Sequence, residues 1–131
     1  MDITKFNTTV ASDKAQTMHL TDPFTGETLF DEEGNTLDFY LYGIQSTAAR
    51  NALADRERKS NKKKLNNEES RRLGAEFLAA LTKGWSKNIE VEGEPLKFTQ
   101  ENAVQLYMDQ DWIGQQVISF VNNLENYAPK A

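Results

Sequence analysis

The chain has 131 residues, of which 38% are hydrophobic and 27% charged, a composition typical of one globular domain. It contains no cysteine, which excludes disulfides and thiolate metal sites, and no apolar run approaches the roughly 20 residues of a membrane-spanning helix. The formal net charge is −5, and the first residues lack the basic and apolar regions of a secretory signal, so we expect a cytosolic protein that binds no membrane.

The amino-terminal residues 1–14 are polar, with isolated apolar side chains and no sustained period. This pattern predicts a flexible arm, or a strand that becomes ordered on a neighbour. We expect residues 15–131 to form a single domain.

The next part of the chain has the alternation of short strands and turns that is typical of a β-meander. Short β-forming runs at 17–20 and 28–30 are separated by turns rich in Asp, Pro and Gly. Residues 37–42 then alternate between apolar and polar, which is typical of a half-buried strand. The sequence therefore predicts a small antiparallel meander over about 17–43, whose apolar face needs a cover.

Helical spacing begins after the meander and continues to about residue 126. Ser46 or Thr47 can cap a helix over 48–58, whose apolar side consists almost entirely of alanine. Residues 60–67 read as a hinge or frayed joint, because Ser and Asn side chains compete for backbone hydrogen bonds. A stronger amphipathic helix follows over 68–81.

The carboxyl-terminal part combines one hairpin with two helices. Residues 89–98 predict a short hairpin or a loop, and Thr99 can cap a helix over 100–108. Asp109 or Asp111 starts the last helix, which has the cleanest amphipathic pattern in the chain. The fold class we expect is α+β, a small N-terminal antiparallel β-meander followed by three to four packed α-helices.

Residues that could build an active site are nearly absent. His19 is the single histidine, so it cannot form a nucleophilic dyad with cysteine or a two-histidine metal site. The acidic run 31–35 fails as a calcium loop, because aligning Gly34 puts Leu29 and Tyr40 at positions that need oxygen ligands. We therefore expect no catalytic residue, metal or cofactor, and a protein that binds other proteins instead of catalysing a reaction.

The charge is unevenly distributed, since residues 50–72 carry a formal charge of +5 and the remainder −10. This segment has three interpretations: a solvated helix, a docking surface for an acidic partner or for the acidic part of a second copy, or a nucleic-acid site. Nucleic acid is the least favoured, because no recognition motif or interleaved aromatic residue accompanies the lysines.

Tryptophan is enriched at interaction hot spots, although in a core this small a structural role is favoured for each tryptophan. Trp85 and Trp112 therefore join the basic residues as candidates for partner binding. The candidate set is Arg50, Arg56, Arg58, Lys62, Lys63, Lys64, Trp85 and Trp112.

Several segments follow one another in a recognisable order between about residues 17 and 124. They are DPFTGE at 22–27, DEEG at 31–34, GIQS at 43–46, LTKGW at 81–85, IEVEGEPLKFTQENA at 89–103 and DWI at 111–113. In this order they resemble the phage tail assembly chaperone family. Each motif is only moderately specific by itself, and the shared order carries the resemblance.

The resemblance implies a chaperone that coats the tape measure protein and recruits tail tube subunits during tail assembly. Such a protein would act in the host cytoplasm, with self-association as a further option, and would be absent from the mature virion. Two other functions remain open: a structural component of the tail or neck that stays in the virion, and a small nucleic-acid-binding regulator.

Overall fold

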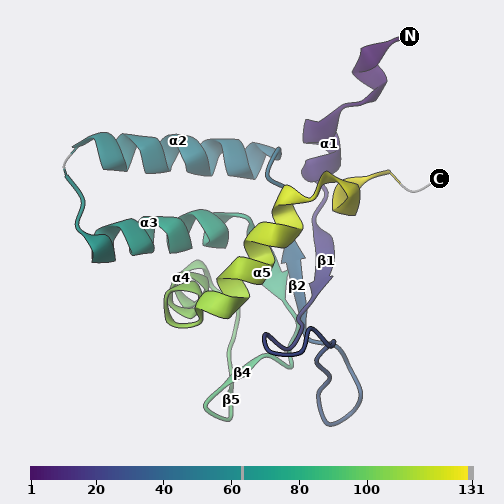
Figure 1. The fold of residues 1–131 in the computed structure, drawn as a ribbon, viewed down its shortest axis with the longest axis vertical. Helices are drawn as coiled ribbons and strands as arrows, with labels where there is room; N and C mark the ends of the chain where they lie inside the picture. The colour runs from purple at the N-terminus through teal and green to yellow at the C-terminus, as the bar shows by residue number, and fades with distance from the viewer. Residues whose placement is uncertain (63, 130–131) are drawn as a thin grey trace.

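The computed structural model describes residues 1–62 and 64–129 and has an α+β fold, as the sequence predicts. Within these residues a three-stranded antiparallel sheet lies beside four longer helices (Figure 1). The strands are β1 (Gln16–His19), β2 (Asp38–Leu41), β3 (Thr82–Trp85), β4 (Glu90–Val91) and β5 (Glu94–Pro95). The helices are α1 (Thr8–Ser12), α2 (Thr47–Lys62), α3 (Asn67–Ala80), α4 (Gln100–Asp109) and α5 (Asp111–Asn122), with 3-10 turns η1 (Ile3–Lys5) and η2 (Leu124–Tyr127).

Strand β2 is the centre of the main sheet, in the order β1-β2-β3. Phe39 of β2 pairs with Met18 on one side and with Trp85 on the other. The alternation that predicts a half-buried strand at 37–42 is confirmed, since Phe39 and Leu41 are fully buried. Strands β4 and β5 form a separate two-stranded hairpin, within the segment 89–98 where one is predicted.

The third strand of the sheet corrects the predicted meander. Residues 28–30 form only isolated bridges, because Asp22 and Asp31 draw the surrounding loop into tight turns by accepting hydrogen bonds from backbone N–H groups. The third position belongs to β3, which the sequence pattern hides, because it is four residues long and Gly84 reads as the end of the helix predicted at 68–81.

Helices α2 and α4 begin at their predicted caps, Ser46 and Thr99. Ser46 Oγ accepts a hydrogen bond from the backbone N–H of Ala49, 3.1 Å away, and Thr99 Oγ1 accepts one from Asn102, 3.0 Å away. Asn66 starts α3 with a capping box shared with Glu69. The joint predicted at 60–67 is shorter than expected, because α2 continues to Lys62 and α3 begins at Asn67.

The amino-terminal residues run beside the carboxyl-terminal turn η2 (Figure 1). Ser12 is fully buried, and its carbonyl accepts a hydrogen bond from the backbone N–H of Gly43. The carboxylate of Asp13 accepts from the backbone N–H of Thr47, 2.6 Å away, and so caps α2 from outside the helix. The flexibility expected for 1–14 stays a prediction.

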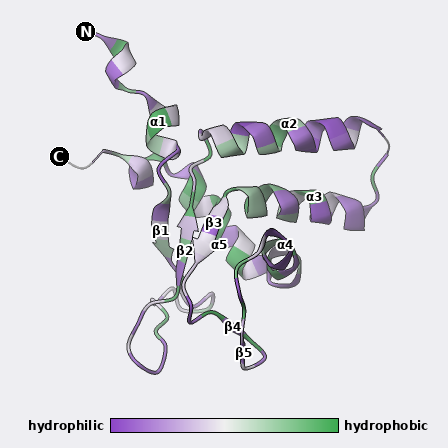
Figure 2. Ribbon diagram, turned by 180° about the vertical axis from the view of Figure 1, so that it is seen from behind, coloured by the Kyte–Doolittle hydropathy of each residue, from purple (hydrophilic) through white to green (hydrophobic). Residues whose placement is uncertain are grey.

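The core lies between the sheet and the inner faces of α3, α4 and α5, where hydrophobic residues gather (Figure 2). The ring of Phe39 contacts Trp85 and Tyr107, with centroids 5.5 and 6.5 Å apart. The Tyr107 hydroxyl lies 2.7 Å from Thr82 Oγ1, which itself donates to the Leu78 carbonyl at 2.8 Å. Thr82 has one hydroxyl proton and gives it to Leu78, so the Tyr107 hydroxyl donates to Thr82 Oγ1. Burial raises the pKa of Tyr107.

The Thr82–Tyr107 contact yields a first prediction. Thr82→Val keeps the shape but leaves the Tyr107 hydroxyl buried without its partner, so we expect the free energy of unfolding to fall by about 1–3 kcal/mol. Denaturant unfolding measures this loss. Adding Tyr107→Phe removes both hydroxyls, and the double variant should lose less than the sum of the two single variants. If the loss of the double variant equals the sum of the two single losses, the two hydroxyls do not interact.

The close approach at Gly43 yields a second prediction. A Cβ added there would lie 2.7 Å from Ser12 Oγ and 2.8 Å from Ser12 Cβ. Gly43→Ala should therefore lower the free energy of unfolding by about 1–3 kcal/mol, through overpacking. Gly84→Ala is the matched control, because its added Cβ would meet Tyr40 at an ordinary 3.8 Å. Equal stability of the two variants would show that the approach is not tight.

Candidate interaction surface

Helices α2 and α3 form an antiparallel hairpin that projects from the body of the molecule (Figure 1). We call residues 47–80 the arm, and its end near Lys62 and Lys64 the tip. Helix α2 is 16 residues long, yet Ala49 is its one buried residue. The ribbon is mostly hydrophilic toward the tip (Figure 2). A helix this exposed gains little stability from packing against the rest of the molecule. It is therefore a candidate surface for a partner.

The contact between α2 and α3 uses small and amphipathic side chains. Arg56 lies over the ring of Phe77, 5.9 Å from its centroid, and Lys59 Nζ lies 3.6 Å from a Glu76 carboxylate oxygen. Such exposed polar contacts contribute on the order of 1 kcal/mol or less each. The outer part of α2 is therefore held to α3 much less firmly than α3 is held to the core.

The predicted basic residues Arg50, Arg56, Arg58 and Lys62 lie on α2, whereas Lys64 follows its end, and these residues do not form one cluster. The Arg50 guanidinium lies 3.5 Å from Thr9 Oγ1 of α1, and Arg58 pairs with Asp55 one turn earlier in α2. Lys62 and Lys64 at the tip are exposed and make no ion pair within the described residues. Lys63, also a predicted binding residue, lies outside the described residues.

The tip carries a small hollow between the two helices, with a volume of about 380 Å³. Leu65 and Leu73 contribute apolar surface to it, Lys59, Lys62 and Arg72 contribute positive charge, and Glu69 and Glu76 contribute negative charge. Sequence reasoning missed Leu65, because a single leucine within a run of Lys and Asn shows no periodicity. The hollow gives the tip an apolar contact as well as a charge.

The two tryptophans lie apart from the arm's tip and have different environments. Trp85 is only 7% exposed, and its indole N–H donates to the Leu96 carbonyl at 2.7 Å. Its ring meets Phe98 edge to face, with centroids 4.9 Å apart. Trp112 is half-buried on α5 and lines a separate hollow with Pro23. The structure thus does not bring the seven described candidates to one surface, and Trp85 is a core side chain.

An acidic groove, which no sequence pattern predicts, lies between the loop around residues 30–38 and the segment 85–90. Its volume is about 1150 Å³. Its charged lining residues are Asp31, Glu32, Glu33, Asp38 and Glu90, with Lys87 as the opposing cation. The groove thus concentrates negative charge from two segments that are far apart in the sequence.

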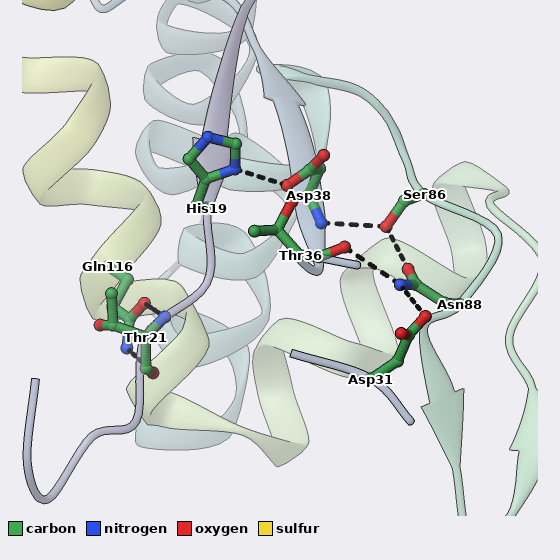
Figure 3. Close-up of polar contacts among 8 residues, drawn as sticks. All are labelled: His19, Thr21, Asp31, Thr36, Asp38, Ser86, Asn88 and Gln116. Atoms are coloured by element: carbon green, nitrogen blue, oxygen red, sulfur yellow. Dashed lines mark hydrogen bonds and ion pairs between the residues drawn. The ribbon is translucent and has the colours of Figure 1, made fainter. Parts of the chain in front are cut away.

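Polar contacts hold the two walls of the acidic groove together (Figure 3). The amide of Asn88 donates to Asp31 at 2.8 Å and to the Thr36 carbonyl at 3.0 Å. Ser86 accepts from the backbone N–H of Asp38 at 2.9 Å. The hydrogen bond from Asn88, followed by one from the Asn35 backbone, lowers the pKa of Asp31, which therefore stays ionised at neutral pH.

The same cluster includes His19, whose Nδ1 lies 2.6 Å from Asp38 (Figure 3). The Ser86 hydroxyl instead contacts Asn88, 2.5 Å away, so serine, histidine and aspartate do not line up as a proton relay. Within the described residues, no three His, Asp or Glu side chains are placed to hold a metal ion. No helix there is long and apolar enough to cross a bilayer.

Comparison with known protein families matches residues 33–131 to the YdaY prophage protein family. No curated protein and no solved structure matches the chain. The matched region contains the arm, β3 and the two carboxyl-terminal helices. It confirms the broader part of what the sequence led us to expect, a phage or prophage protein. Because the match covers well over half of the chain, this protein belongs to the YdaY prophage protein family.

Proposed function

We propose that this prophage protein is a non-catalytic tail assembly chaperone, which binds the tape measure protein and helps to recruit tail tube subunits in the host cytoplasm. The observation that carries the proposal is the arm, whose 16-residue helix α2 buries one residue. Membership of a prophage family and the order of sequence motifs support the same role.

The outward side of α2 offers both apolar and charged contacts to a helical client. Leu53 is 48% exposed, and Arg50 and Glu57 lie three residues before and four after it, on the same side of the helix. A client helix can pack its apolar stripe against Leu53 and place charged side chains beside these neighbours. The proposed client surface is therefore the middle of α2.

A groove between α3 and α5 extends the apolar surface of the arm. Its volume is about 390 Å³, and its lining includes Leu78, Met108 and Ile118. Arg71 borders it and donates to the Met108 carbonyl at 2.8 Å. Shallow apolar grooves with charged borders suit a client that must later be released, because the buried area, and with it the affinity, stays modest.

The third prediction tests client binding. The chain is co-expressed with the tape measure protein of the same prophage, and the complex is recovered through a tag on the tape measure protein. Leu53→Glu should reduce the recovered chain about tenfold or more, because it removes one apolar contact and places a charge in its position. The matched control is Leu124→Glu on η2, whose leucine is 40% exposed. Undiminished recovery of the Leu53 variant would reject α2 as the client surface.

The fourth prediction separates a chaperone from a structural tail component. Particles released after prophage induction are purified and analysed by mass spectrometry against the cell lysate. We expect the tape measure protein in the particles and this chain only in the lysate. Recovery of the chain in particles, in constant ratio to the tube protein, would identify a structural component instead.

A further inference from the structure

Two surfaces of this molecule have opposite charge and lie at different places in the fold. We propose that the tip of the arm of one copy docks into the acidic groove of a second copy, so that the chain associates head to tail. This inference concerns the protein alone and does not rest on its proposed function as a chaperone.

The acidic groove has carboxylates available for a partner. Glu32 and Glu33 lie on one wall and Glu90 on the other, and none of the three forms an ion pair within the described residues. Asp31 is different, because its carboxylate is occupied by Asn88 and the backbone of its own turn. Three exposed carboxylates therefore line the groove without an ion pair in the described part of the chain, although Lys87 also borders it.

The groove also offers an apolar contact. Phe30 lines it and is 61% exposed, although a phenylalanine normally gains from burial. An aromatic side chain beside charged residues is a common composition for the centre of a protein interface. Phe30 thus supplies the apolar contact that charge attraction alone lacks.

The tip of the arm has the matching composition. Lys62 and Lys64 make no ion pair within the described residues, and Leu65 lies beside them in the tip hollow. Two lysines against three glutamates, with Leu65 against Phe30, give a pair of surfaces that agree in charge and in apolar character. Both surfaces come from short exposed segments, so docking requires no rearrangement of the core.

The arrangement of the fold favours contact between copies over contact within one copy. The arm's tip lies at one side of the molecule, whereas the loops that form the groove gather at the lower end of the sheet (Figure 1). Each copy therefore has one basic tip and one acidic groove that remain separate. An interface between two different surfaces is heterologous, so it leaves an unused tip and an unused groove at the ends of every assembly.

Salt should control this association, because charges at exposed sites are screened over about 8–10 Å at physiological ionic strength. The first measurement is sedimentation velocity of the purified full chain over a range of concentrations. At low salt the average mass should rise with concentration beyond that of a dimer, and at about 0.5 M salt it should return to the monomer. A monomer at every concentration in low salt would overturn the proposal, and so would a closed dimer that is insensitive to salt.

Charge reversal identifies the two surfaces. The tip variant Lys62→Glu/Lys64→Glu and the groove variant Glu32→Lys/Glu90→Lys should each associate at least tenfold more weakly than the wild type at low salt. An equimolar mixture of the two should regain association, because the reversed tip matches the reversed groove and the native tip matches the native groove. A mixture that stays monomeric, or single variants that associate like the wild type, would overturn the pairing.

The matched control is Lys83→Glu/Lys97→Glu, which makes the same change in net charge at two other exposed lysines. It should associate like the wild type, and an equal loss would mean that overall charge, not the tip, governs association. Circular dichroism of every variant confirms that the fold is retained. All substituted side chains are exposed and make no ion pair within the described part of the chain.

Discussion

The direct passage from α3 into β3 is the constraint on which the rest of the structure depends. Helix α3 ends at Ala80 and β3 begins at Thr82, so pairing of β3 with β2 also fixes the direction of the helix. The Thr82 hydroxyl joins the last turn of α3 to Tyr107 of α4, in a site where an unpaired hydroxyl is costly. The end of α3 that meets the sheet, which we call the root of the arm, is thereby fixed to the core by hydrogen bonds and by burial together.

From that root outward, the contacts that hold the arm become weaker. Helix α3 keeps an apolar stripe that ends in the core, with Phe77 and Leu81 buried. Helix α2 has Ala49 and a few amphipathic contacts, so most of its surface faces solvent. Local stability increases with the apolar surface that a segment buries. The arm therefore has a root held firmly in the core and an outer helix, α2, whose displacement requires little free energy. A surface of this kind suits a partner that must be held and later released.

Local patterns in the sequence predict much of this fold, and pairing over long sequence distances accounts for the rest. Caps at Ser46 and Thr99 and the stripe of the last helix depend on neighbours within a few residues, so the sequence reveals them. Strand β3 depends on β2, some forty residues earlier, and no local signal distinguishes it from a helix end. The acidic groove is hidden for the same reason, since Asn88 joins two walls that are 57 residues apart. The basic residues of the arm are visible in the sequence because they fall within one short stretch, residues 50–72.

The uneven charge of the sequence acquires a physical meaning once the fold separates its two signs. A net charge of −5 would by itself keep copies apart. The arm, however, carries most of the basic segment, and five acidic side chains line a groove elsewhere in the fold. Local attraction between the oppositely charged surfaces can then exceed the weak repulsion between whole molecules. Salt screens interactions between distant charges more strongly than interactions between charges in contact. If the proposed client is long, copies that associate head to tail gain affinity from each other as well as from the client, since every added copy makes two contacts. Contacts that are weak singly and favourable together would allow such an assembly to form on the proposed client and to dissociate from it later.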